Sequence, residues 1–147
     1  MVRNKKSEEL NNLINKDIKT GKLLKIYYSD GNKEERKIEI DIYNSIIIEE
    51  YNLNKTEYKI NKSDINKLKR YIKKYNFPAW SNLPMGDLLA LDAPSKELIL
   101  YYDNSKYGGN YLDFYKINFY SRIPKDGYIY LNRFIEKIYE IKEKNNR

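Results

Sequence analysis

The hydrophobic and polar positions between residues 63 and 75 repeat with the period of an α-helix. Apolar side chains recur at i, i+3, i+7 and i+10, which places them on one helical face. These side chains are Ile65, Leu68, Ile72 and Tyr75. We expect Ser63 to cap the helix start with its hydroxyl, and Asp64 to meet the positive end of the helix dipole. The other faces carry Lys67, Lys69, Arg70, Lys73 and Lys74.

An aromatic segment follows this helix. Because Phe77 precedes a proline, we expect it to leave the helical region, so that residues 77–80 form a loop. Trp80 either plugs the end of the core or forms an exposed ligand platform, and we favour the plug because leucines crowd nearby. These leucines are Leu83, Leu88, Leu89 and Leu91. We expect Asp92 to hold backbone amides in a turn before the next strand.

Period-two alternation predicts strands on both sides of the central helix. Segment 35–43 alternates isoleucine with charged residues, as in a strand with one buried and one solvated face. Asp30-Gly31, just before it, is a hairpin signal. The other expected strands are 22–28, one starting at 46, 56–60, 97–103 and 111–122. In strand 111–122, two alternative sets of side chains can face the core. One is Leu112 with Phe114, and the other is Tyr115 with Ile117 and Phe119.

Two further helices are expected near the ends of the chain. Ser7 begins a short amphipathic helix, for which Gly21 is a suitable C-cap. Its apolar face comprises Leu10, Leu13, Ile14 and Ile18. Residues 128–144 form the closing helix, with Phe134, Ile135, Ile138 and Ile141 on its buried side.

These elements define the expected fold class. Neighbouring strands with tight turns predict an α+β fold, with a mostly antiparallel sheet of about five or six strands and two or three helices packed on it. A chain of 147 residues suits a single domain. Its segments are the N-terminal helix (1–21), the strand meander (22–60), the helix with the Trp loop (61–94), the hairpin (95–122) and the C-terminal helix (128–144).

The absence of cysteine and histidine excludes several classes of catalytic and metal-binding site. With no Cys there is no thiolate nucleophile, and with no His there is no imidazole base and almost no transition-metal site. We therefore assign no catalytic residue, no metal ligand and no cofactor from the sequence. A metal-dependent nuclease with Asp41, Glu57 and Lys59 is the remaining enzyme hypothesis. The same Glu-x-Lys spacing recurs at Glu35–Lys37 and Glu140–Lys142, so chance explains it equally well.

The net charge of +7 favours an acidic partner, although an AT-rich genome also raises the lysine content. Our leading hypothesis is a non-catalytic inhibitor, immunity or accessory protein that binds an acidic protein through helix 63–75 and loop 106–111. Nucleic-acid binding is the alternative, because the 16 tyrosines can stack on bases while lysines follow the phosphates. The expected contact residues are Lys69, Arg70, Lys73, Lys74, Lys106, Tyr107 and Tyr111.

Three short motifs are shared with a known group of proteins. They are Lys74-Tyr75-Asn76, Trp80 and Leu91-Asp92-Ala93. From residue 22 onward the layout resembles a group of small, uncharacterised bacterial α+β proteins and lipoproteins. The resemblance implies a fold and no activity. The chain has no apolar run near the ~20 residues of a membrane span and no apolar signal core, so we expect a cytoplasmic location.

Overall fold

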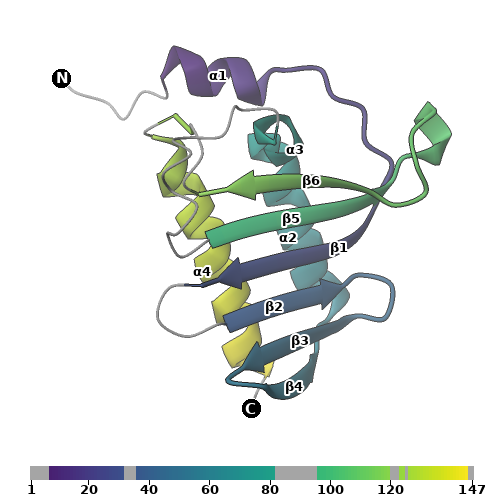
Figure 1. The fold of residues 1–147 in the computed structure, drawn as a ribbon, viewed down its shortest axis with the longest axis vertical. Coiled ribbons are helices and arrows are strands. Elements are labelled where there is room, and N and C mark those ends of the chain that lie inside the picture. The colour runs from purple at the N-terminus through teal and green to yellow at the C-terminus, as the bar shows by residue number, and fades with distance from the viewer. Residues whose placement is uncertain (1–6, 32–35, 82–95, 120–122, 125, 146–147) are drawn as a thin grey trace.

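Figure 1 shows the fold in a computed structural model that describes residues 7–31, 36–81, 96–119, 123–124 and 126–145. Six strands form one sheet in the order β4-β3-β2-β1-β5-β6, and all neighbours are antiparallel. They are β1 (Lys22–Asp30), β2 (Arg36–Asp41), β3 (Ile46–Tyr51), β4 (Asn54–Lys59), β5 (Lys96–Asp103) and β6 (Asp113–Asn118). The expected α+β fold and antiparallel sheet are confirmed.

Helices cover one face of this sheet. Figure 1 shows α2 (Lys62–Tyr75) and α4 (Gly127–Asn145) crossing the same face, with α1 (Glu8–Ile14) and α3 (Phe77–Trp80) toward the β6 edge. The apolar side chains predicted for the inner sides of α2 and α4 are all buried. The buried hydrophobic residues of the sheet and helices form one continuous cluster.

The strand register explains the alternation in the sequence. Ile26, Ile40 and Ile47 lie side by side on β1, β2 and β3 and face the helices, where they are buried. The opposite face carries charged pairs across neighbouring strands: Lys25–Glu39 at 3.4 Å, Lys37–Glu50 at 3.8 Å and Lys116–Glu97 at 3.0 Å. In β6, Ile117 faces inward with Tyr115, while Phe114 points outward and is 62% exposed.

The N-cap of α2 differs from the prediction. Asn61 has an extended backbone, and its Oδ1 accepts a 2.8 Å hydrogen bond from the Asp64 amide, so the helix begins at Lys62. Ser63 lies inside the first turn. An asparagine is as good a cap as a serine, and the sequence alone did not distinguish the two positions. Asp64 is buried, not solvated.

The predicted loop after α2 is a helical turn. Asn76 adopts a left-handed conformation with φ 52°, which ends α2 and lets α3 begin at Phe77. Pro78 is tolerated early in α3, where no intrahelical N–H bond is lost. Phe77 and Trp80 are 0% and 1% exposed. The free energy gained by burying these rings outweighs the steric cost of a helical backbone at Phe77, the residue before the proline.

The predicted role of Trp80 as a core plug is confirmed. Its indole N–H donates to the Tyr75 carbonyl at 2.9 Å, and its ring meets Phe77 edge-on at 5.0 Å between centroids. Asp92 and the four leucines expected beside Trp80 lie outside the described residues.

Helix α1 is shorter than predicted, since it ends at Ile14 with Asn15 as its C-cap. Asn76 Nδ2 satisfies nearby carbonyls by donating to Leu13 at 3.0 Å and to Lys16 at 2.8 Å. Gly21 is therefore not the cap of this helix. A Cβ at Gly21 would lie 1.8 Å from the Asp103 carbonyl oxygen, so glycine is required there by close backbone approach.

A candidate cationic binding groove

A groove of about 540 Å³ lies where the linker after α1, the start of β1 and the C-terminal half of α2 meet. Its base is apolar and includes Ile18, Leu23, Ile72, Pro78 and Tyr102. Four exposed lysines form its rim: Lys19, Lys22, Lys69 and Lys73. None of the described residues that line it is acidic. We call this site the cationic groove.

The helical period explains how α2 contributes to both parts of the groove. Lys69 and Lys73 are four residues apart, so they lie on the same side of the helix. Ile72 lies beside them and is 3% exposed, so it anchors this side of the helix in the core. Neighbouring positions of one helix thus supply both a charged rim and an apolar base.

Tyr102 brings a buried phenol to the base of the groove. It is 6% exposed and packs edge-on against Tyr115, with 5.6 Å between ring centroids. Burial raises the pKa of Tyr102 above its usual range, so the ring stays neutral at physiological pH. The groove therefore gains no negative charge from this residue.

A second hollow of about 410 Å³ adjoins the groove and shares Thr20, Gly21, Lys22 and Tyr107 with it. It adds Lys106 to the cationic surface, and also Asp103. Asp103 accepts hydrogen bonds from the Ser105 hydroxyl at 2.6 Å and the Ser105 amide at 3.0 Å, which hold its pKa below the ordinary value. This carboxylate thus serves the turn after β5.

Asn104 fixes the loop against the groove. Its side-chain oxygen accepts from the Gly21 amide at 2.8 Å, and its Nδ2 donates to Asp113 at 3.0 Å and to Tyr115 at 2.8 Å. The hydrogen bond from Asn104 lowers the pKa of Asp113. The Asn104 carbonyl also accepts from the amides of Tyr107 and Gly109. One buried amide side chain therefore connects the α1–β1 linker to the β5–β6 loop.

The predicted contact residues are only partly brought together. Lys69, Lys73 and Tyr107 line the groove, and Lys106 lines the adjoining hollow. Arg70 and Lys74 are exposed on α2 but do not line either hollow, and Tyr111 is 73% exposed in the loop. The residues that the sequence analysis missed are Lys19, Lys22 and Tyr102. No local pattern singles them out. The antiparallel pairing of β1 with β5 brings Lys22 near Tyr102, and Lys19 lies just before β1 in the linker.

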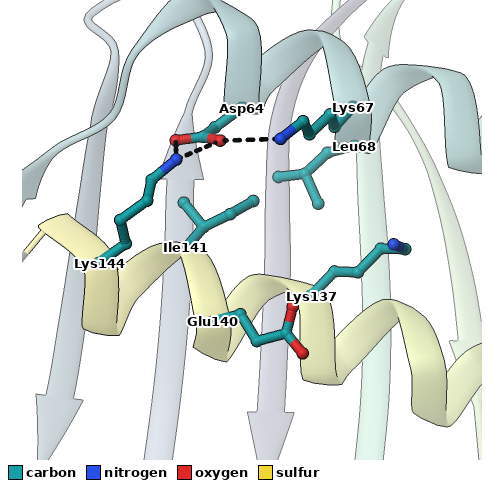
Figure 2. Close-up of a pocket in the computed structure, with 7 residues that line it drawn as sticks. All are labelled: Asp64, Lys67, Leu68, Lys137, Glu140, Ile141 and Lys144. Carbon is teal, nitrogen blue, oxygen red and sulfur yellow. Dashed lines mark hydrogen bonds and ion pairs between the residues drawn. The ribbon is translucent and has the colours of Figure 1, made fainter.

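Figure 2 shows a different hollow, of about 220 Å³, between α2 and α4. Asp64 is 1% exposed there, and Lys144 Nζ lies 2.8 Å from its Oδ1 and 2.7 Å from its Oδ2. Lys67 approaches from the next turn of α2 at 4.0 Å. The buried carboxylate is thus neutralised by two lysines. The arrangement joins the start of α2 to the end of α4 and commits the Asp64 carboxylate to these lysines.

The nuclease hypothesis receives no support from the sheet geometry. Asp41 pairs with Ile46, which pairs with Lys59, so one strand separates Asp41 from β4. Two strand spacings amount to roughly 9–10 Å, and Glu57 lies two residues further along β4. Asp41 instead accepts hydrogen bonds from Asn44 at 2.7 and 3.0 Å. The two carboxylates do not converge on a common metal position.

Comparisons with known proteins do not identify a family. No family model matches the chain, and searches of curated proteins and of solved structures found no match. Among the described residues, no helix combines the length and the apolar character needed to cross a membrane.

Proposed function

We propose that this protein binds, without catalysis, an acidic segment of a partner protein in the cationic groove. The observation that carries the proposal is the composition of the groove, which combines a rim of four lysines with an apolar base. Such a surface complements a polypeptide that alternates carboxylates with apolar side chains. An inhibitor, immunity or accessory protein would use the groove in this way.

The rim charges are available for a partner. Within the described part of the chain, none of Lys19, Lys22, Lys69 and Lys73 forms an ion pair. Lys22 lies opposite Asp103 on the paired strand β5, and Asp103 is already hydrogen bonded to Ser105. Four cations around one hollow repel one another, and a bound carboxylate relieves that repulsion.

The apolar base favours a polypeptide over a phosphate backbone. Leu23, Ile72 and Tyr102 line the groove together with the half-buried Ile18, so an inserted apolar side chain would cover the apolar surface that they still expose. A phosphodiester chain would use the lysines and leave this base unfilled. Lysine stems also pack along apolar side chains while their ammonium groups remain in water.

One observation favours nucleic acid as the alternative partner. The exposed residues of α2 include six cations and no acidic residue, because the acid of this helix, Asp64, is buried. The six cations are Lys62, Lys67, Lys69, Arg70, Lys73 and Lys74. They extend over roughly 18 Å of helix at 1.5 Å per residue. A surface of this kind can follow phosphates, and its affinity would then fall steeply as salt concentration rises.

Fluorescence anisotropy distinguishes the two partners. The probes are a labelled peptide alternating glutamate with leucine, a labelled oligoglutamate of equal charge, and a labelled oligothymidylate. We expect the alternating peptide to bind most tightly and to remain bound at physiological salt. Equal binding of both peptides would contradict a role for the apolar base. Tight, steeply salt-dependent binding of the oligothymidylate alone would instead support the nucleic-acid alternative.

A pair of charge-matched variants locates the binding site. Lys69→Glu/Lys73→Glu reverses two rim charges and should abolish peptide binding. Lys55→Glu/Lys59→Glu makes the same charge change on the exposed edge strand β4 and should leave binding nearly intact. Equal losses in both variants would show that net charge, not the groove, determines affinity. No peptide binding to the unmodified protein would refute the proposal.

A further inference from the structure

The β5–β6 loop and the start of β6 together present an unusual concentration of exposed hydrophobic side chains. Among the described residues, seven large hydrophobic side chains are exposed, and four of these lie between residues 107 and 114. They are Tyr107 at 48%, Tyr111 at 73%, Leu112 at 56% and Phe114 at 62%. Figure 1 shows this loop projecting beyond the end of the sheet. We call these four residues the hydrophobic tip.

Internal hydrogen bonds hold the tip in this exposed position. Besides the contacts of Asn104 already described, the Asn104 amide donates to the Asn110 carbonyl at 3.0 Å. The Asn110 amide donates to Asp113 at 3.2 Å, which closes the turn before β6. Gly108, with φ 82°, permits the left-handed turn after the short 3₁₀ helix at Ser105–Tyr107. The loop is thus built to present apolar side chains to its surroundings.

Cations lie next to the hydrophobic tip. Lys106 places its Nζ 5.6 Å from the centre of the Tyr107 ring, and it lines the adjoining hollow together with Lys22. Tyr107 also lines the cationic groove with Lys69 and Lys73. The acids of the loop, Asp103 and Asp113, are hydrogen bonded within it. Apolar side chains therefore project ahead of a set of lysines.

We propose that the hydrophobic tip inserts into the interfacial region of an anionic lipid bilayer. Tyrosine prefers the headgroup level of a membrane, and leucine and phenylalanine gain free energy from the acyl boundary. Lysines behind the tip would then meet the anionic headgroups, with their aliphatic stems lying along the interface.

The shape of the tip favours a bilayer over a second protein. A protein partner would need a complementary pocket for each of these side chains, and the loop projects from the end of a hairpin (Figure 1). A soft interface can accommodate such a projection without a complementary pocket. The inference shares Tyr107 and the groove lysines with the proposed function. It can be tested separately, because Tyr111, Leu112 and Phe114 do not line the cationic groove.

Vesicle co-sedimentation tests the inference. We expect the protein to bind phosphatidylcholine vesicles that contain phosphatidylserine, and to bind pure phosphatidylcholine vesicles more weakly. Tyr111→Ala/Leu112→Ala/Phe114→Ala should weaken partitioning roughly tenfold or more, since it removes most of the inserted apolar surface. Absence of binding to both vesicle types, or unchanged binding of this variant, would overturn the proposal.

A matched variant controls for general hydrophobicity. Tyr43, Leu53 and Ile129 are also exposed, at 82%, 91% and 51%, but lie outside the loop. Tyr43→Ala/Leu53→Ala/Ile129→Ala should keep vesicle binding, and an equal loss here would contradict insertion of the tip. The tip variant should still bind the alternating acidic peptide, which separates failure of this inference from failure of the proposed function.

A fluorescent reporter shows insertion directly. Trp80 is 1% exposed, so its emission should barely respond to vesicles. Leu112→Trp adds a second tryptophan at the tip, and its emission should shift to shorter wavelength with anionic vesicles. An unshifted spectrum in a variant that sediments with the vesicles would show that another surface makes the contact, and would overturn the proposal.

Discussion

Lys142→Ala should destabilise the fold by breaking an ion pair in which both side chains are largely buried. Lys142 extends from α4 to Glu49 on β3, with 2.8 Å between Nζ and Oε2. The side chains are only 9% and 13% exposed, so this pair lies in the interior between the helix and the sheet. Removing the lysine leaves the glutamate carboxylate buried without its closest partner.

The magnitude follows from the partner that remains. Breaking a buried ion pair from one side costs about 3–5 kcal/mol. Arg36 lies 4.0 Å from the same Glu49 oxygen and can take up part of the charge, so we expect the lower end, about 3 kcal/mol. A domain of this size loses about 2–4 °C per kcal/mol, so the midpoint should fall by roughly 6–12 °C.

Urea and thermal unfolding followed by circular dichroism measure this loss. Lys116→Ala is the control, because Lys116 also pairs with a glutamate, Glu97 at 3.0 Å, but is 48% exposed. It should cost less than about 1 kcal/mol. Adding Glu49→Gln to Lys142→Ala should recover part of the stability, since it removes the buried charge. If Lys142→Ala costs no more than Lys116→Ala, the assignment of a buried, energetically coupled pair is refuted.

Three other predictions concern the core and the loop. Trp80→Ala should cost about 3–5 kcal/mol in urea unfolding, and an unchanged midpoint would contradict its role as the core plug. Gly21→Ala forces its Cβ against the Asp103 carbonyl and should cost about 1–3 kcal/mol in the same assay, whereas a neutral result would rule out the close approach. Asp103 and Asp113 have pKa values below the ordinary aspartate value of 3.8. Their ionised carboxylates should therefore stabilise the loop to a constant extent above pH 3.8, and this stabilisation should be lost as the pH falls below 3.8. The amide NMR shift of Gly109 reports this transition, and no change in acid would contradict it.

Part of the candidate site could be predicted from the sequence. The helical period identified Lys69 and Lys73 as neighbours on one exposed side of α2, and the tyrosine-rich loop identified Tyr107. Arg70 and Lys74 share that helix and its charge, yet they lie outside the groove. Periodicity gives the angle of a residue around its own helix, but not which angles face another segment.

The sequence by itself determined the elements whose patterns are local. Alternating isoleucines in β2, the apolar stripe of α2 and the buried side of α4 each follow from burying one face and solvating the other. Local preference was less reliable where two good caps compete, as with Asn61 and Ser63, or where core burial overrides the conformation favoured before a proline, as at Phe77.

Only the tertiary structure decided where these elements meet. The hydrogen bond from Gly21 to Asn104 joins residues 83 positions apart, and it places the linker lysines beside the β5–β6 loop. The pair of Lys142 with Glu49 spans 93 positions. Such contacts depend on strand order and helix packing, which minimise exposed apolar surface over the whole chain, and therefore no window of neighbouring residues contains them.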